Sequence, residues 1–245
     1  MENQRQPKMP EENPIIVALD VPDWPAAREL VDELYPVVSF FKIGMELFTA
    51  EGPRTIEAIK AIGGKVFLDL KYHDIPNTLK GAIAAAARLG VDMLTIHISG
   101  GTAMLEAAAH AAALAPNPMI LLGVTVLTSI DGDTLQNELR IKEGLEDYVV
   151  YLGKMAIESG LQGIVASPRE VKGLRQALGK EALIVTPGIR PSWGTRGDQR
   201  RVASPQEALA LGASYLVIGR PITAASDPLG AATRILEELS GHTER

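Results

Sequence analysis

The feature that most constrains the fold is a unit that recurs eight times along the chain: a short apolar run, a loop, and an amphipathic stretch rich in alanine, leucine and glutamate. The apolar runs are Ile15–Leu19, Phe40–Ile43, Val66–Leu70, Met93–Ile98, Met119–Val126, Gly163–Ala166, Leu183–Thr186 and Tyr215–Ile218. Most are continuously apolar rather than alternating, which is typical of parallel strands that are covered on both faces. The repeat therefore predicts a parallel α/β architecture.

The segments between these runs are predicted to be helices. They are Pro25–Leu34, Pro53–Ile62, Leu79–Leu89, Ala103–Ala115, Leu145–Ser159, Pro168–Leu178, Pro205–Leu211 and Leu229–Leu239. Several are followed at once by glycine, the residue that most readily ends a helix. Eight units in about 230 residues, roughly 29 residues each, are typical of a single-domain (β/α)8 TIM barrel. We expect the barrel over residues 14–240, preceded by a flexible tail over residues 1–13.

A doubly wound open sheet would also alternate strands and helices. That fold commonly carries a Gly-x-Gly-x-x-Gly sequence directly after its first strand. No such sequence follows Leu19, and the count of eight units favours the barrel. In a barrel, catalytic residues lie where the strands end and the following loops begin.

Composition excludes several classes of protein and partner. The chain has no cysteine, which excludes disulfides, thiolate catalysis and cysteine-ligated zinc. The longest apolar runs, such as Met119–Leu127, fall well short of the ~20 residues of a membrane span. Met1–Asn13 is polar and lacks the apolar core of a secretory signal, so we expect a cytoplasmic protein. The net charge of −6 argues against nucleic acid and anionic membranes as partners.

The most informative segment is Phe67–Asp74, where charged residues interrupt an apolar run. Because side chains alternate across a strand, Asp69 and Lys71 point to the same face, and Lys42 projects toward them from the neighbouring strand. An ion pair that only fixes strand register would explain Asp69 and Lys71, but Lys42 and Asp74 favour an organised array of charges. Opposite charges ~4 Å apart attract by about 4 kcal/mol at an effective dielectric of ~20. Such pairing would keep Lys71 protonated and able to act as a general acid.

Basic residues gather after the seventh predicted strand. They are Arg190, Arg196, Arg200 and Arg201, and they face a single acid, Asp198. The stretch also contains Gln199 and several glycines, and Gly219-Arg220 follows the last strand. Barrels commonly bind phosphate with the loops after strands seven and eight. A surface salt bridge would explain any one arginine, but the combination favours an anionic ligand whose phosphate lies here.

Six segments together resemble the orotidine 5′-phosphate decarboxylase family over nearly the whole chain. They are Ala18–Asp20, Phe41–Gly44, Phe67–Thr78, Val126–Ser129, Thr186–Arg190 and Val217–Ile222. The sequence Asp-x-Lys-x-x-Asp-Ile-Pro-x-Thr at Asp69–Thr78 is highly specific to that family, whereas the glycine-arginine ending alone is a weak signal. No position in these segments departs from the family pattern.

The resemblance implies a cofactor-free and metal-free TIM barrel enzyme of pyrimidine biosynthesis, which converts orotidine 5′-monophosphate to uridine 5′-monophosphate (UMP) and CO₂. It implies that Lys71 protonates C6 of the pyrimidine and that the carboxylates of Asp69 and Asp74 flank it. A homodimer is implied, in which Asp74, Ile75 and Thr78 are supplied across the interface. Lys42 completes the array and, with Asp20, resembles the pair that holds the ribose. The other implied substrate contacts are Thr128 and Ser129 at the pyrimidine, Arg190, Gln199, Gly219 and Arg220 at the phosphate, and Pro187.

Two other functions stay open. Related barrels that act on sugar phosphates resemble this chain at Asp20 and Asp69–Asp74, but they carry a glutamate in the second strand that helps to bind Mg²⁺. Here that position is Lys42, which cannot ligate a metal while protonated. A non-catalytic phosphate-binding barrel would use the basic loop but not the charged strand, so an assay for loss of orotidine monophosphate would separate it.

The sequence also leads to expectations for two loops and for the four histidines. Phosphate binding is expected to drive closure of residues 190–201. The connection at 131–145 either covers the site or only links two elements. The four histidines lack the spacing of metal ligands, so no metal site is expected. His97 is expected in the core, and His73 beside the array is expected to order a loop.

Overall fold

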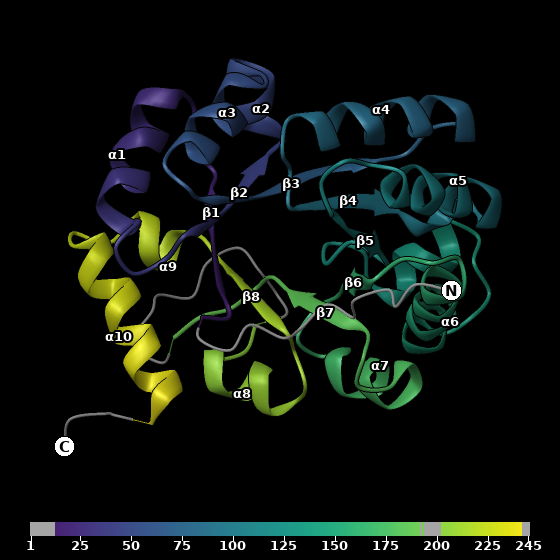
Figure 1. The fold of residues 1–245 in the computed structure, drawn as a ribbon. Helices are drawn as coiled ribbons and strands as arrows, with labels where there is room; N and C mark the ends of the chain where they lie inside the picture. Colours follow the sequence, from purple (N-terminus) through teal and green to yellow (C-terminus); the bar gives the residue numbers. More distant parts are fainter. Residues whose placement is uncertain (1–12, 192, 194–201, 242–245) are drawn as a thin grey trace.

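In the computed structural model of the chain, which describes residues 13–191, 193 and 202–241, eight parallel strands close into a barrel in sequence order (Figure 1). The strands are β1 (Ile15–Leu19), β2 (Phe40–Gly44), β3 (Lys65–Tyr72), β4 (Met93–His97), β5 (Ile120–Val124), β6 (Gly163–Val165), β7 (Leu183–Thr186) and β8 (Tyr215–Ile218). Each pairs with the next, and β8 pairs with β1. The predicted (β/α)8 barrel is confirmed, and its strands lie at the apolar runs.

Helices surround the barrel and cover its outer face (Figure 1). They are α1 (Trp24–Leu34), α2 (Met45–Glu51), α3 (Arg54–Ala61), α4 (Pro76–Arg88), α5 (Thr102–Ala113), α6 (Leu145–Glu158), α7 (Val171–Leu178), α8 (Pro205–Ala210), α9 (Arg220–Thr223) and α10 (Pro228–Ser240), with a 3₁₀ turn η1 (Ile98–Gly100) and a π-helical turn η2 (Thr134–Glu138). The sequence did not predict α2, α9, η1 or η2. Of these, α2 and η1 directly follow strands, α9 begins one residue further after β8, and η2 lies in the connection at 131–145.

Polar caps explain where several helices begin. The Asp23 side chain accepts a hydrogen bond from the first turn of α1, and Asp227 does the same for α10. Ser204 and Glu207 form a reciprocal capping box at α8. All three helices have proline in the first turn, where its missing N–H leaves no bond unmade.

Buried apolar side chains form two layers, one on each face of the sheet. Between strands and helices lie residues such as Ile15, Val17 and Leu19. Inside the barrel lie their alternates, such as Ile16 and Phe67. Burial on both faces is the reason that the strands read as continuous apolar runs. At the carboxyl ends of the strands the inner layer gives way to charged residues, and the site lies there.

The side chain of Asn13 links the start of β1 to the loop before β2 by hydrogen bonds. Its side-chain amide donates to the Val37 carbonyl at 2.7 Å and its side-chain oxygen accepts from the Ile15 N–H at 2.9 Å. Residues 1–12, which carry most of the predicted tail, lie outside the described residues. Within the described part of the chain, no helix has both the length and the apolar character needed to cross a bilayer.

Candidate active site

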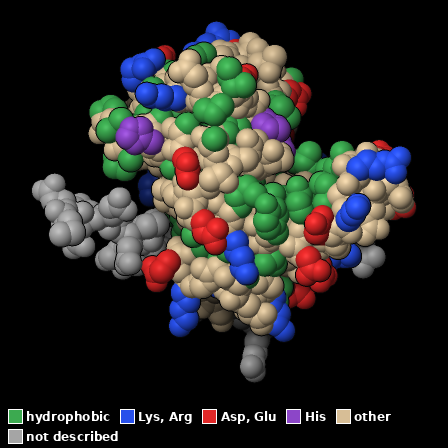
Figure 2. All heavy atoms as spheres, turned by 90° about the vertical axis from the view of Figure 1, so that its right-hand side faces the viewer, with side chains coloured by type: hydrophobic (Ala, Val, Ile, Leu, Met, Phe, Trp, Pro, Cys, Tyr) green, Lys and Arg blue, Asp and Glu red, His purple; other side chains and the backbone are tan. Residues whose placement is uncertain are grey.

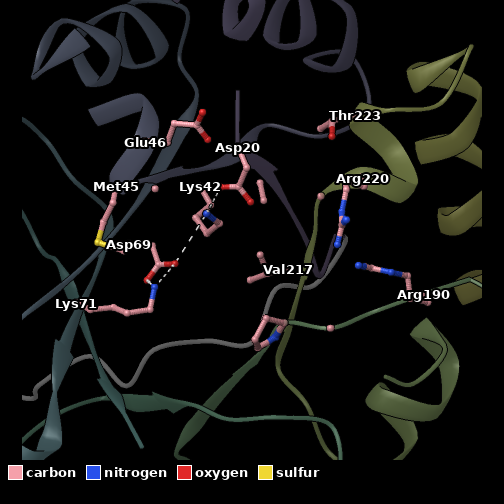
Figure 3. A pocket seen from close by; sticks show the side chains of 15 residues that line it. Asp20, Lys42, Met45, Glu46, Asp69, Lys71, Arg190, Val217, Arg220 and Thr223 are labelled. Carbon is pink, nitrogen blue, oxygen red and sulfur yellow. Dashed lines mark hydrogen bonds and ion pairs between the residues drawn. The ribbon is translucent and has the colours of Figure 1, made fainter. Parts of the chain in front are cut away.

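A cavity of about 520 Å³ opens at the carboxyl ends of the strands (Figure 3). The predicted site residues that line it are Asp20, Lys42, Asp69, Lys71, Pro187, Arg190, Gly219 and Arg220. Asp69 and Lys71 lie on one side of the cavity and Arg190 and Arg220 on the other (Figure 3). A chamber of about 180 Å³ adjoins it and shares Lys42, Asp69 and Lys71; Thr128 lines this chamber. The barrel thus brings residues from most of the matching segments to one mouth.

Four charged side chains form a continuous chain of ion pairs in the cavity. The Lys42 Nζ atom lies 2.8 Å from Asp20 Oδ1 and 3.8 Å from Asp69 Oδ2. The Lys71 Nζ atom donates to both carboxylate oxygens of Asp69 at 3.0 Å. The Lys42 and Asp69 side chains are only 10% and 16% exposed, so each needs an opposite charge nearby. We call this set, Asp20, Lys42, Asp69 and Lys71, the charge array.

A β-bulge in β3 positions Lys71, the last member of the array. The four-residue step from Leu68 to Tyr72 faces only the two-residue step from Leu94 to Ile96 in β4, so β3 bulges there. Lys71 has a φ of 52°, a left-handed conformation that costs a residue other than glycine roughly 1–2 kcal/mol.

Thr95 of β4 bridges this bulge. Its hydroxyl accepts from the Lys71 backbone N–H at 2.9 Å and donates to Asp69 Oδ1 at 3.0 Å. Leu70 and Tyr72 still pack on the outer layer, so Lys71 keeps the inward orientation that the alternation predicted. The hydroxyl of Thr95 therefore fixes both the carboxylate and the strained backbone beside it.

Gly44, at the end of β2, leaves room for the other half of the array. A Cβ atom at this position would lie 3.0 Å from Lys42 Nζ and 3.1 Å from Asp20 Oδ1. Such contacts are too close for an undisturbed ion pair. Glycine at this position thus lets Lys42 reach Asp20 without displacing either side chain.

Two histidines lie beside the array at the ends of β3 and β4. The His73 and His97 ring centroids are 5.4 Å apart. Burial lowers the pKa of His97 below its ordinary value; the positive charges of His73 and Lys71 add to this, and Asp69 opposes it. His97 is half-buried at the barrel mouth rather than enclosed in the core, and its imidazole favours the uncharged form.

The basic end of the cavity is built from the loops after β7 and β8. The Arg190 backbone N–H donates to the Ala203 carbonyl at 2.9 Å, and Ile189 forms an isolated bridge with Ala203, so these contacts join both flanks of the intervening stretch. The Arg190 guanidinium donates to the Ile189 carbonyl at 2.8 Å. Gln199, Arg196, Arg200 and Arg201 lie outside the described residues.

Of the predicted site residues that the structure describes, four do not line the cavity or the chamber within one chain. They are Asp74, Ile75, Thr78 and Ser129. Asp74 Oδ1 accepts from the Ile75 N–H at 2.6 Å, and Ile75 is 67% exposed. Asp74, Ile75 and Thr78 follow β3 into the exposed start of α4. Ser129 follows Thr128, which alone of the pair lines the chamber.

Sequence reasoning missed several residues that the fold brings to the site. Met45 and Glu46 of α2 and Thr223 of α9 line the cavity, and Ser167 lines the chamber. Met45 directly follows a strand, so the rule that barrel sites lie at strand ends would have found it. Thr95 carries no charge or motif that would have marked it.

The described residues include no group of three or more histidine, aspartate or glutamate side chains that could hold a metal ion. The expectation of metal-free chemistry stays a prediction, since it rests on the resemblance of the motifs.

Comparison with known proteins agrees with the geometry. Residues 13–235 match the family described as Orotidine 5′-phosphate decarboxylase / HUMPS family. The chain is 53% identical to the orotidine 5′-phosphate decarboxylase of Moorella thermoacetica, with 96% of each chain covered, and 49% identical to that of Synechocystis sp., with 92% and 97% covered. The crystal structure of orotidine 5′-phosphate decarboxylase from Lactobacillus acidophilus superposes with a TM-score of 0.83 at 40% identity, covering 93% of this chain and 99% of that one. The chain therefore belongs to the orotidine 5′-phosphate decarboxylase / HUMPS family.

Proposed function

We propose that this chain decarboxylates orotidine 5′-monophosphate to UMP and CO₂, as a step of pyrimidine biosynthesis, without a metal or cofactor. The observation that carries the proposal is the position of Lys71, whose ammonium lies 3.0 Å from both oxygens of Asp69 in a cavity with two arginines on its opposite side. The names and the high identity of its relatives support the same activity.

The proposed reaction breaks one bond and forms one bond at C6 of the pyrimidine. The C6–carboxylate bond breaks, CO₂ leaves, and the electron pair stays on C6. Lys71 then gives a proton from Nζ to C6 and regains one from water. A fixed ammonium next to C6 stabilises the negative charge as it develops, and it is oriented before the substrate arrives.

Asp69 gives this ammonium its position. Its carboxylate accepts from Lys71 and Thr95 and lies 3.8 Å from the Lys42 Nζ atom. A substrate carboxylate bound beside Asp69 would be a second negative charge in the same region. Loss of CO₂ moves that charge from the carboxylate to C6, beside the Lys71 ammonium, so the array interacts more favourably with the developing carbanion than with the bound substrate.

The remaining predicted residues bind the parts of the substrate that do not react. Asp20 and Lys42 hold the ribose hydroxyls, while Thr128, Ser129 and Pro187 contact the pyrimidine. Arg190, Gln199, Gly219 and Arg220 hold the phosphate. Binding energy gained at the phosphate would drive closure of residues 190–201 and so assist chemistry at the far end of the cavity.

A homodimer completes the proposed site. Asp74, Ile75 and Thr78 leave the barrel mouth at the start of α4 and are exposed in one chain. Figure 2 views the molecule from the side that is on the right in Figure 1, where apolar side chains gather between charged ones. In the proposed dimer the start of α4 packs against the second copy, so that Asp74 lies near the partner's Lys71.

Mixing two inactive variants tests the shared site. If Asp74 acts across the interface, a dimer of one Lys71→Ala and one Asp74→Ala chain has one site with both defects and one intact site. Random exchange would then restore about a quarter of wild-type activity. No recovery in a mixture that has demonstrably exchanged subunits would show that the two residues act within one chain.

No nucleic-acid or membrane partner is proposed, because the chain carries a net charge of −6. We propose the cytoplasm as its compartment, which fits a chain without cysteine.

The Lys71→Ala variant tests the chemistry. It should lose decarboxylation, followed as the change in pyrimidine absorbance, while it still binds UMP. Lys60→Ala is the matched control, because Lys60 also pairs with an aspartate, Asp92 at 2.8 Å, but does not line the cavity. Turnover by Lys71→Ala close to that of Lys60→Ala would overturn the assignment.

A further inference from the structure

Two buried hydroxyl oxygens, Ser167 Oγ and Thr186 Oγ1, have no hydrogen-bond partner among the described residues. Both residues have no exposed surface. Buried hydroxyls in folded proteins nearly always have a partner, so each orphan needs an explanation. A bound ligand can supply the partner only where the side chain borders a space that the ligand can enter.

The two hydroxyls point to opposite faces of the barrel. In β7, Val185 belongs to the inner layer and Ile184 to the outer layer, so Thr186 faces the helices. In β6, Val165 packs against the inner layer, so Ser167, two residues later, is on the inner face. Ser167 lines the 180 Å³ chamber, and Thr186 lines neither the chamber nor the larger cavity. Only Ser167 is placed to meet a ligand.

The backbone of Ser167 is held in position. Its N–H donates to Glu170 Oε2 at 2.9 Å, and the Glu170 N–H donates back to the Ser167 carbonyl at 3.0 Å. Glu170 is itself buried. The hydroxyl is therefore left with rotation about χ1 as its main freedom, and a change of χ1 rotamer would change the direction in which it points.

The chamber suits a flat ring with one polar edge. Phe67, Val124, Val126, Val165 and Val217 supply apolar walls. Its charged side is formed by Lys42, Asp69 and Lys71, and its neutral polar groups include the hydroxyls of Thr128 and Ser167. Sites of this composition bind apolar rings and orient them with a few polar contacts.

The order of the strands indicates which edge of a bound pyrimidine would face Ser167. In the closed barrel, β6 lies three strands from β3, so Ser167 and Lys71 approach the chamber from well-separated directions. If C6 of a pyrimidine lies at Lys71, N3 is the ring atom directly opposite C6, and C4 is next to N3. The N3–C4 edge is then turned away from β3, toward the side of the barrel that contains β6.

We propose that Ser167 is a specificity-determining residue whose hydroxyl hydrogen-bonds the N3–C4 edge of the bound pyrimidine. This inference rests on the proposed function and adds a residue that the family resemblance did not supply. A hydroxyl can donate to the C4 carbonyl or accept from the N3–H, so it matches either group of this edge. It would contribute to the affinity for the base and not to the affinity for the sugar phosphate.

Binding of two ligands to Ser167→Ala tests this proposal. UMP carries the base, and ribose 5-phosphate carries the same phosphate without it. We expect Ser167→Ala to bind UMP about five- to tenfold more weakly than the wild type and ribose 5-phosphate equally well, as measured by calorimetry. Thr186→Val, which removes the other orphan hydroxyl, is the matched control and should bind both ligands as the wild type does.

The other possible results of these binding measurements would contradict one of the two proposals. Unchanged UMP affinity in Ser167→Ala, or an equal loss for both ligands, would overturn the role of Ser167. A wild-type protein that binds ribose 5-phosphate but not UMP would instead overturn the proposed function. Should Ser167→Ala fail to fold, Ser167→Cys keeps a side chain of similar size with a weak donor and carries the same expectation.

Discussion

The two ends of the cavity are built in different ways. The charge array stands on β2, on β3 and on the residue directly after β1, and every member pairs with another member. The basic end stands on the loop after β7 and on the first residue of α9, with Arg190 and Arg220 as its described cations. Strands hold side chains in place more firmly than the segments that follow them, so this barrel puts the array mainly on strands and the proposed phosphate contacts beyond the strand ends.

This difference predicts two kinds of variant. Changes in the array should lower kcat, because they disturb groups that act on the reacting carbon. Changes at the arginines should mainly raise KM for the phosphorylated substrate, because they act far from that carbon. A change at either end that produced the other pattern would break the comparison.

Replacement of Asp69 should have the largest effect. Asp69→Asn keeps the shape of the side chain but removes the negative charge that lies between the Lys42 and Lys71 ammoniums. We expect kcat to fall by about 10³-fold or more, since orientation of the proton donor and stabilisation of charge are both lost. Steady-state kinetics with orotidine monophosphate measure this.

Asp92→Asn is the control for Asp69→Asn. Asp92 also pairs with a lysine, Lys60, and accepts from the Val66 N–H at 2.7 Å, but it does not line the cavity. It should lower the melting temperature and leave kcat near the wild-type value. Equal losses of kcat in the two variants would show that the array acts only as structural support.

Replacement of Arg220 should have the next largest effect. Charge-assisted hydrogen bonds contribute about 1.5–3 kcal/mol, so Arg220→Ala should raise KM for orotidine monophosphate by roughly 10–150-fold. Turnover of the nucleoside orotidine, which lacks the phosphate, should hardly change. Arg28→Ala, on the exposed face of α1, is the control. If the nucleoside suffered as much as the nucleotide, Arg220 would not be a phosphate contact.

Replacement of Gly44 by alanine should have an intermediate effect that is confined to the array. The new Cβ would lie 3.0 Å from Lys42 Nζ and force the Lys42–Asp20 pair apart. We expect about a tenfold loss of kcat/KM, with binding of inorganic phosphate unchanged. Gly173→Ala in α7 is the control, because a Cβ there meets no atom within 4 Å. An active Gly44→Ala enzyme would mean that the array tolerates a shift.

The sequence predicted the parts of this site that follow from strand geometry. The strands were found because burial on both faces requires continuous apolar runs, and the charges of β3 stood out against such a run. Alternation then correctly predicted that Asp69 and Lys71 share a face. Lys42 was placed beside them because β2 precedes β3 in the barrel.

The parts that sequence reasoning missed depend on contacts between distant segments. The bulge at Lys71 exists because Thr95 of β4 binds both its N–H and Asp69, and nothing in the lysine itself signals a positive φ. The short helix α2 begins directly at the end of β2, and the sequence pattern predicted no helix at Met45–Glu51. The orphan hydroxyl of Ser167 is defined by what it fails to contact, which only coordinates can reveal.

Titration of His97 should produce the smallest effect, and only at the array end. Burial, His73 and Lys71 lower its pKa in the folded protein below the ordinary value near 6.5, so the unfolded chain binds the proton more readily. His97 thus contributes stability that is fully present above about pH 6.5 and is lost as the pH falls through the folded pKa. Replacement by glutamine should flatten the fall in melting temperature between pH 7.5 and 5 by about a degree or two. His110→Gln, on the exposed face of α5, is the control, and a His97→Gln protein that kept the full wild-type pH dependence would remove His97 from the array's electrostatic surroundings.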